Sequence, residues 1–308
     1  MNNFDKFLFG RNLLEASRTS FSDCEKIIFS NEDKDINIPY YLNKHGYRSE
    51  EFNKNNEVLV LGCSQTYGSG MLNEFTWPEF FCNNINKKYS RIASRGDSIN
   101  GQVYKAFKYF EEIGNPKIVL ALFPLYRLEY PMVPDKFISP GDSYTTAKSV
   151  GQGIAYFNKD FLKFSKAPHD PAHTIPKEFV VYYNFMFLKM LEQYCESHNI
   201  KFIWSIYDEN NIMDDYIEEN IYNIFKNFIK TSKIVSLFNY RMLNNHKDCE
   251  SEEDKEILEK CNHDFEGHEL YDFAADFNKK KDLGHWNIHT HYHIYEKFIE
   301  RYNDIKND

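Results

Sequence analysis

From residue 57 onward, short apolar segments alternate with longer amphipathic ones, and this alternation is the feature that most constrains the fold. The apolar segments, each of strand length, lie at 57–62, 90–94, 116–123, 200–207 and 233–238. The helical segments lie at 73–88, 98–114, 177–199, 214–230 and 287–303. Continuous apolar runs are typical of parallel strands covered on both faces. The pattern predicts an α/β fold, three-layer α/β/α, with a five-stranded parallel sheet in the flavodoxin-like order 2-1-3-4-5.

The alternation also divides the chain. Residues 1–55 are polar and irregular, and we expect an N-terminal extension that packs on the core. Residues 56–308 form the α/β domain, with two insertions. The first, 131–177, is rich in Pro and Gly and indicates a long loop or lid. The second, 244–281, is charged and loop-rich, with one helix expected near 252–261.

Charge and composition exclude several classes of protein. A net charge of -9 argues against a nucleic-acid partner, which needs clustered Lys and Arg. The first residues lack the apolar core of a signal peptide, and the apolar run Ile118–Phe123 is too short to span a bilayer. The six Cys form no CxxC pair, which favours free thiols in a reducing compartment. We therefore expect a cytoplasmic protein with no membrane span; the sequence defines no oligomeric state.

The loop Gly62–Gly70, GCSQTYGSG, follows the first strand of the domain. In a parallel α/β sheet the site lies at the carboxyl ends of the strands, which makes this loop the place to look. It lacks the Lys of a phosphate-binding loop and the GxGxxG pattern of a dinucleotide site, so no nucleotide cofactor is expected. Ser64 is either a nucleophile or the N-cap of the next helix, and the loop taken alone favours the cap.

A second motif far along the chain changes that weighting. Asp282 and His285 have a D-x-x-H spacing just before the last helix. A serine nucleophile needs a base for its hydroxyl and a carboxylate to orient the imidazole. In an α/β sheet the segment before the last helix can lie beside the loop after the first strand, so one short segment would supply both partners of Ser64.

Together these motifs make the chain resemble the SGNH (GDSL-type) hydrolase family. Gly62-Cys63-Ser64 stands where the first block usually has G-D-S, and Gly96 matches the glycine of the second block. Asp282 and His285 match the last block, and His291 matches a further histidine six positions on. The resemblance implies Ser64 as nucleophile, His285 as general base and Asp282 as its partner, with the N–H groups of Ser64 and Gly96 as the oxyanion hole.

The resemblance extends upstream of the first block. Asn43, Gly46 and Arg48 match a segment that precedes this block in several SGNH proteins, and the similarity spans roughly residues 38–128 and 280–300. The implied reaction is the removal of a small acyl group, such as acetyl, from a carbohydrate or another small ester. An O-acyltransferase with the same triad and a non-catalytic SGNH-fold binding protein remain alternatives.

One block departs from the family. The third block normally supplies an Asn to the oxyanion hole, but here the strand runs into Phe123, Pro124, Leu125 and Tyr126. Loss of one oxyanion donor can cost about a hundredfold in rate. Either Tyr126 or Arg127 compensates, or the activity is low or narrow.

Further candidates lie around the loop. Tyr67, Tyr126 and Arg127 are expected to contact substrate; for Tyr67, Tyr126 and Trp77 the competing interpretation is ordinary core packing. Cys63 is expected to pack beneath the turn, because adjacent residues leaving a strand point to opposite sides.

Metal-binding patterns are weak. His289 and His293 have an i, i+4 spacing on the last helix, and Cys249, Cys261 and His263 lie close in sequence. Neither set completes a convincing ligand group, so no metal or cofactor is expected. For His291 we favour a packing or hydrogen-bonding role at the start of the last helix.

Overall fold

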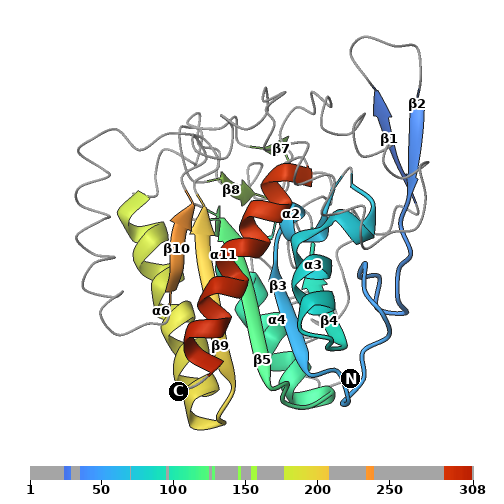
Figure 1. Cartoon of the computed structure of the whole chain (residues 1–308). Helices are drawn as coiled ribbons and strands as arrows, with labels where there is room; N and C mark the ends of the chain where they lie inside the picture. Colours follow the sequence, from blue (N-terminus) through green and yellow to red (C-terminus); the bar gives the residue numbers. More distant parts are fainter. Residues whose placement is uncertain are drawn as a thin grey trace, which may run out of the picture.

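A five-stranded sheet forms the centre of the molecule (Figure 1). The computed structural model describes residues 24–28, 35–69, 71–94, 97–124, 127–128, 145–146, 154–157, 177–207, 234–238 and 288–306. The sheet strands are β3 (Val58–Gly62), β4 (Tyr89–Ala93), β5 (Ile118–Pro124), β9 (Lys201–Tyr207) and β10 (Ile234–Phe238).

The strands are parallel and lie in the order β10-β9-β5-β3-β4. The first strand of the sheet, β3, therefore lies between the second and third, β4 and β5, which places a topological switch point beside it. Registers of β4, β3, β5 and β9 are continuous, whereas β10 joins the edge with a register shift between Ile234 and Leu237. The predicted α/β class and strand order are confirmed.

Helices cover both faces of the sheet. They are α3 (Trp77–Asn84), α4 (Ile99–Glu112), α6 (Lys177–Ser197) and α11 (Ile288–Lys306). Alternate residues of each strand point to opposite faces: Leu59 and Leu61 pack with α4 and α6, and Val58 and Val60 with α3 and α11. Figure 1 shows α11 crossing the front of the sheet.

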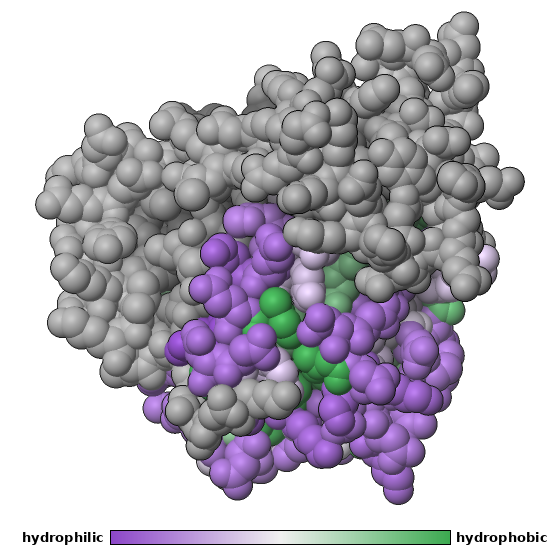
Figure 2. All heavy atoms as spheres, in the orientation of Figure 1, coloured by the Kyte–Doolittle hydropathy of each residue, from purple (hydrophilic) through white to green (hydrophobic). Residues whose placement is uncertain are grey.

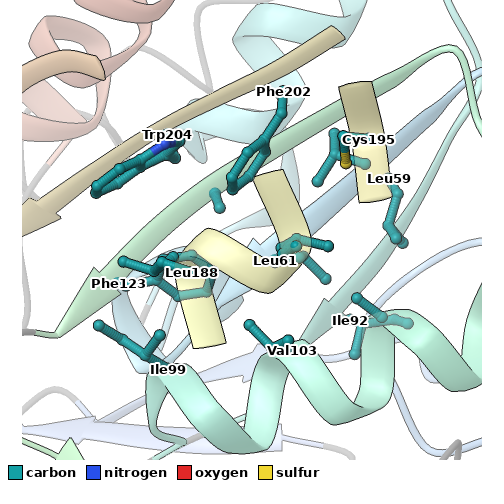
Figure 3. Packing of buried hydrophobic residues seen from close by; sticks show 14 of the residues in the cluster. Leu59, Leu61, Ile92, Ile99, Val103, Phe123, Leu188, Cys195, Phe202 and Trp204 are labelled. Carbon is teal, nitrogen blue, oxygen red and sulfur yellow. The ribbon is translucent and has the colours of Figure 1, made fainter. Parts of the chain in front are cut away.

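The core between the sheet and the pair α4 and α6 is built from branched aliphatic and aromatic side chains (Figure 3). Leu188 of α6 and Val103 of α4 are fully buried there, as is Phe123 of β5. Burial of each such side chain stabilises the fold by about 1.5–3 kcal/mol. Because both faces of β3 and β5 are covered, the carboxyl ends of these strands are held in fixed positions.

One helix start agrees with the sequence, and one predicted helix is divided into two elements. Ser98 is the N-cap of α4, and its hydroxyl oxygen accepts a hydrogen bond from the Gly101 N–H over 3.2 Å. The predicted helix at 73–88 is instead a 3₁₀ turn, η2 (Asn73–Phe75), followed by α3. The break lies at Thr76, whose extended backbone conformation ends the turn before α3 begins.

The sequence did not predict two small sheets that the structure contains. Strands β1 (Cys24–Ile28) and β2 (Asp35–Pro39) form an antiparallel pair within the extension that the sequence indicated to be irregular. Strands β6 (Arg127–Leu128), β7 (Thr145–Thr146) and β8 (Ile154–Phe157) form a three-stranded sheet, and two of them lie in the expected loop 131–177. These strands have two to five residues each, too short for a clear periodic signal. The helices predicted at 214–230 and 252–261 lie outside the described residues.

The segment 40–56 runs along the outer side of β4, which is one of the two edge strands of the sheet. Its Ser49 hydroxyl oxygen accepts a hydrogen bond from the Arg91 N–H over 2.9 Å, and the Asn56 side-chain amide donates to the Tyr89 carbonyl over 3.3 Å. Phe52 of the same segment joins the core beside α4. This segment is therefore tied to the sheet by both polar and apolar contacts.

The described surface is mainly polar. Figure 2 shows mostly hydrophilic residues over the described part of the front face, with a few hydrophobic ones near its centre. Among the helices that the structure describes, none combines the length and hydropathy needed to cross a bilayer.

Candidate active site

Ser64 lies at the carboxyl edge of the sheet, where β3 passes into the single-turn helix α2 (Ser64–Tyr67). Ser64 is the first residue of this helix, and the N-cap position belongs to Cys63, which makes no side-chain capping hydrogen bond. The interpretation of Ser64 as a helix cap is therefore wrong. Ser64 thus opens a helix one residue after the end of a central strand, at the edge of the sheet where α/β folds place their ligand sites.

Gly62 is needed for this turn on steric grounds. A Cβ atom at Gly62 would lie 2.1 Å from Thr66 Oγ1 and 2.8 Å from the Leu122 carbonyl oxygen. The carbonyl belongs to the neighbouring strand β5 and cannot move aside. Close approach of α2 to the end of β3 thus depends on the absence of a side chain at Gly62.

The Ser64 side chain lies in a nearly closed environment. The residue is 7% exposed, and its hydroxyl lies 3.7 Å from the Cys63 sulfur. Cys63 itself is fully buried in the cluster that contains Trp77 and Phe298. The prediction that Cys63 packs beneath the turn is confirmed, and this burial removes the thiol from contact with solvent.

A buried polar network holds the same turn from the side of α4. The Gln102 side-chain oxygen accepts a hydrogen bond from the Gly62 N–H over 3.0 Å, and its amide nitrogen donates to Asp97. The Asp97 carboxylate also forms an ion pair with Lys105 at 2.5 Å, and both side chains are almost completely buried. Charged groups are seldom fully buried unless they are paired. The network therefore connects Asp97, which lies just before α4, to Gly62 at the end of β3.

Sequence reasoning missed Gln102 and Lys105. One signal was present: Gln102 and Lys105 lie three positions apart, on the side of α4 that also carries Val103 and Ala106. Polar residues on an apolar helix face indicate buried partners, although they do not identify them.

The last helix begins at the same edge of the sheet as α2 (Figure 1). In its first turn, His291 is 1% exposed, and its Nδ1 accepts a hydrogen bond from the Trp77 N–H over 3.2 Å. Trp77 is the first residue of α3, so His291 satisfies an amide that the helix itself cannot. The predicted hydrogen-bonding role of His291 is confirmed.

The partners expected for Ser64 lie outside the described residues. These are Gly96, Tyr126, Asp282 and His285. Arg127 is described only by its backbone, as the first residue of β6. The catalytic triad and the oxyanion hole thus stay predictions.

Two aromatic residues have packing roles. Tyr67, which was expected to contact substrate, is fully buried, with its ring edge-on to Tyr40 at 5.4 Å. Trp77 is also fully buried and stacks on Phe298 at 4.7 Å. Both side chains are enclosed, so the interpretation of these two residues as core packing is correct.

Metal-binding groups do not come together in the part of the chain that the structure describes: no cluster of three or more His, Cys, Asp or Glu residues is placed to hold an ion there. His293 instead lies 4.0 Å from Glu296 on the same helix. The side chain of His289 and the set Cys249, Cys261 and His263 lie outside the described residues.

No family model and no curated protein matches this chain. Among solved structures it is similar to a member of the lipolytic protein G-D-S-L family from Veillonella parvula DSM 2008, at 12% identity and a TM-score of 0.37, over 80% of this chain and 96% of that one. It is also similar to an acetyl xylan esterase from the rumen bacterium Butyrivibrio proteoclasticus, at 13% identity and a TM-score of 0.31, over 67% of this chain and 57% of that one. A third similar structure is that of a carbohydrate esterase, which is 10% identical to this chain, with a TM-score of 0.32, over 71% of this chain and 74% of that one. Similarities of this extent do not assign an activity to this chain.

Proposed function

We propose that the chain is a serine ester hydrolase of the SGNH type, with Ser64 as its nucleophile. The observation that carries this proposal is the position of Ser64 as the first residue of α2, one residue after the carboxyl end of the inner strand β3. Gly62 permits the turn, and the Gln102 side chain fixes the preceding amide. Strand-to-helix turns of this kind place a nucleophile at the edge of an α/β sheet.

The D-x-x-H motif supports the same proposal. His285 lies three residues before α11, whose first turn is bonded to the start of α3 through His291 and Trp77. Three extended residues span at most about 10 Å. The motif therefore leads into a helix that starts at the sheet edge where Ser64 lies, and it supplies the two residue types that a serine nucleophile lacks.

In the proposed reaction Ser64 Oγ attacks the carbonyl carbon of an ester while its proton passes to His285. Asp282 holds the imidazole and stabilises the imidazolium. The tetrahedral intermediate collapses, the C–O bond to the alcohol breaks, and His285 returns the proton to the leaving oxygen. Water then attacks the acyl-enzyme with His285 as base, which releases the acid and restores Ser64.

The oxyanion would be held by the N–H groups of Ser64 and Gly96. The third-block Asn is replaced by the apolar end of β5, which runs to Pro124. Removal of one oxyanion donor typically lowers kcat by about a hundredfold or more. We therefore propose that either Tyr126 or Arg127 supplies the third donor or the enzyme is slow or narrowly specific.

For the substrate we propose a small acyl ester, such as an acetyl group on a carbohydrate. The support is the family resemblance of the motifs together with the high aromatic content, 17%, which suits flat sugar faces. Transfer of the acyl group to a sugar hydroxyl instead of water uses the same residues. Product analysis with an acetyl donor, with and without an acceptor glycan, separates the two reactions.

Covalent labelling with a fluorophosphonate tests the nucleophile. The intact protein should be labelled at Ser64, and Ser64→Ala should not be labelled. Ser69→Ala is a matched control, because Ser69 is buried in the same loop only five residues away. Unlabelled intact protein, or a Ser64→Ala variant labelled as well as wild type, would refute the proposal and favour a non-catalytic binding protein.

A further inference from the structure

The carbonyl groups at the end of α2 accept their hydrogen bonds from arginine side chains. A single helical turn leaves its last carbonyls without partners inside the helix. Here the carbonyls of Thr66, Tyr67 and Gly68 are all bonded by guanidinium groups that come from other parts of the chain. The helix that begins with Ser64 is thus held at its opposite end by long-range contacts.

Arg48 makes most of these contacts. Its Nη1 donates to the Gly68 carbonyl over 2.6 Å and to the Tyr67 carbonyl over 3.3 Å, and its Nη2 donates to the Met71 carbonyl over 2.6 Å. The guanidinium also lies over the Tyr40 ring, 4.3 Å from its centroid. Three carbonyls over five residues are therefore fixed by one planar group, which presents its donors in a rigid fork.

Arg91 of β4 completes the arrangement. Its Nη1 donates to the Thr66 carbonyl over 3.3 Å and to the Thr76 hydroxyl over 3.2 Å. Its Nε donates to the backbone carbonyl of Arg48 over 2.7 Å. Arg91 thereby fixes both the helix and the backbone of the residue that holds the helix.

These two arginines are not ordinary ion-pair residues. Arg48 is 3% and Arg91 1% exposed, and within the described ranges neither forms an ion pair with a carboxylate. Burial, and next the charge of Arg91, lowers the pKa of Arg48 to about 10, so the group stays charged at neutral pH. Burial of a charged group is costly unless its donors are hydrogen-bonded, and the carbonyl contacts supply those bonds to both guanidinium groups.

The backbone of the turn is adapted to Arg48. Gly68 has a left-handed conformation with φ of 75°, and a Cβ there would lie 3.2 Å from Arg48 Nη1 and 2.4 Å from Thr76 Cγ2. Its N–H and that of Ser69 both donate to the Ser64 carbonyl, over 3.0 and 3.1 Å. Displacement of the Gly68 carbonyl would therefore move the backbone of Ser64 itself.

We infer that Arg48 is a positioning residue for the Ser64 nucleophile: it fixes the carbonyl end of the turn 64–71 and so sets the orientation of Ser64. This inference rests on the proposed function. Arg48 acts through the backbone and does not touch the substrate. A misplacement of about 1 Å in a nucleophile costs on the order of a hundredfold in rate, so a contact at the far end of a single turn is enough to control reactivity.

The experiment compares Arg48→Ala, Arg48→Lys and wild type by the rate of fluorophosphonate labelling of Ser64 and by hydrolysis of p-nitrophenyl acetate. Arg48→Ala should lower the labelling rate and kcat by about a hundredfold with little change in KM. Arg48→Lys should recover only part of the rate, because one ammonium group cannot match the planar fork. Arg301→Ala is the matched control, since Arg301 lies on α11 and its ion pair among the described residues is a long one, 3.7 Å from Asp304.

Rescue with guanidinium separates positioning from general loss of stability. Arg48 and Arg91 line a pocket of about 410 Å³, and the exposed Tyr41 is one of its other lining residues. Addition of guanidinium at about 50 mM, far below denaturing concentrations, should restore part of the labelling rate of Arg48→Ala. Urea at the same concentration should not restore it, and a variant that is simply less stable would be restored by neither additive.

Hydrogen exchange gives a readout that does not depend on activity. The amides of Gly68 and Ser69 should lose protection in Arg48→Ala while those of α4 keep it. If wild type is labelled and Arg48→Ala is labelled at the same rate, the inference is wrong and the proposed function stands. If wild type is not labelled, the proposed function fails. In that case the exchange measurement still tests Arg48. If the Gly68 amide of Arg48→Ala exchanges at the wild-type rate, Arg48 does not hold the turn. If that amide loses protection, Arg48 holds the turn but has only a structural role.

Discussion

The side chain of Gln102 on α4 is bonded to the backbone of Gly62 at the end of β3, 3.0 Å from amide nitrogen to amide oxygen. This contact joins α4 to the turn that carries Ser64. Because the Gly62 N–H is buried, loss of its acceptor leaves a donor without a partner. The turn is therefore held from the α4 side at its start and by Arg48 at its end.

Replacement of Gln102 by Leu should lower the free energy of unfolding by about 1–3 kcal/mol, the cost of an unsatisfied buried donor. Urea denaturation followed by circular dichroism measures the change. Gln193→Leu is the control, because Gln193 is exposed on α6 and its loss should not alter stability. Equal effects of the two substitutions would contradict the role given to Gln102.

The buried ion pair between Lys105 and Asp97 predicts a larger effect. Lys105→Met should destabilise the protein by about 3–5 kcal/mol, because it leaves the Asp97 carboxylate buried without its positive partner. The double variant Asp97→Asn, Lys105→Met should be more stable than Lys105→Met alone, since no uncompensated charge remains. Lys44→Met, which removes a surface pair with Glu51, should leave unfolding unchanged. A double variant less stable than the single one would count against this explanation.

His291 provides a test that separates a structural role from a chemical one. His291→Phe removes the acceptor of the Trp77 N–H and should lower the free energy of unfolding by about 1–3 kcal/mol. The folded fraction should still be labelled by a fluorophosphonate at Ser64. His198→Phe, at an exposed position after α6, is the control. A stable His291→Phe protein that is not labelled would show that His291 takes part in the reaction.

The thiols of Cys82 and Cys195 should resist alkylation in the folded protein. Burial, followed by Glu79, raises the pKa of Cys82 well above its ordinary value. Burial, followed by Glu192 and Glu196, raises the pKa of Cys195 to about 12. Since the thiolate is the reactive form, iodoacetamide at about pH 8 should modify both residues only after urea is added. Peptide mass spectrometry after alkylation reads out each cysteine separately, and modification of the native protein at the unfolded rate would refute the prediction.

The raised pKa of Cys195 also determines how the stability of the protein changes with pH. Between its ordinary pKa of 9.0 and about 12, the unfolded chain loses a thiol proton that the folded chain keeps. The free energy of unfolding should therefore fall as the pH rises through this window, and Cys195→Ala should show a shallower fall. Urea titrations across the window measure the slope. An equal slope in the variant would mean that other groups govern the alkaline loss of stability.

The sequence predicted the sheet well because both faces of the strands are buried, so each strand is a continuous apolar run such as Val58–Gly62. It also placed Ser64 at the correct edge, since strand order alone fixes that position. The side chains that support the turn were harder to find. The partners of Arg91 and Lys105 are distant in sequence or lie on another element, and local patterns do not reveal which buried polar groups meet. The Asp282 and His285 motif remains a prediction.

The segment 40–56 has a consequence for how molecules of this protein meet one another. The outward-facing groups of β4, the Tyr89 carbonyl and the Arg91 N–H, are already bonded to Asn56 and Ser49. An uncovered edge strand is a template on which a strand of another molecule can add. With these two groups occupied by its own chain, this part of the edge is closed to intermolecular strand addition, and the segment that supplies Arg48 to the Ser64 turn also shields the sheet from aggregation.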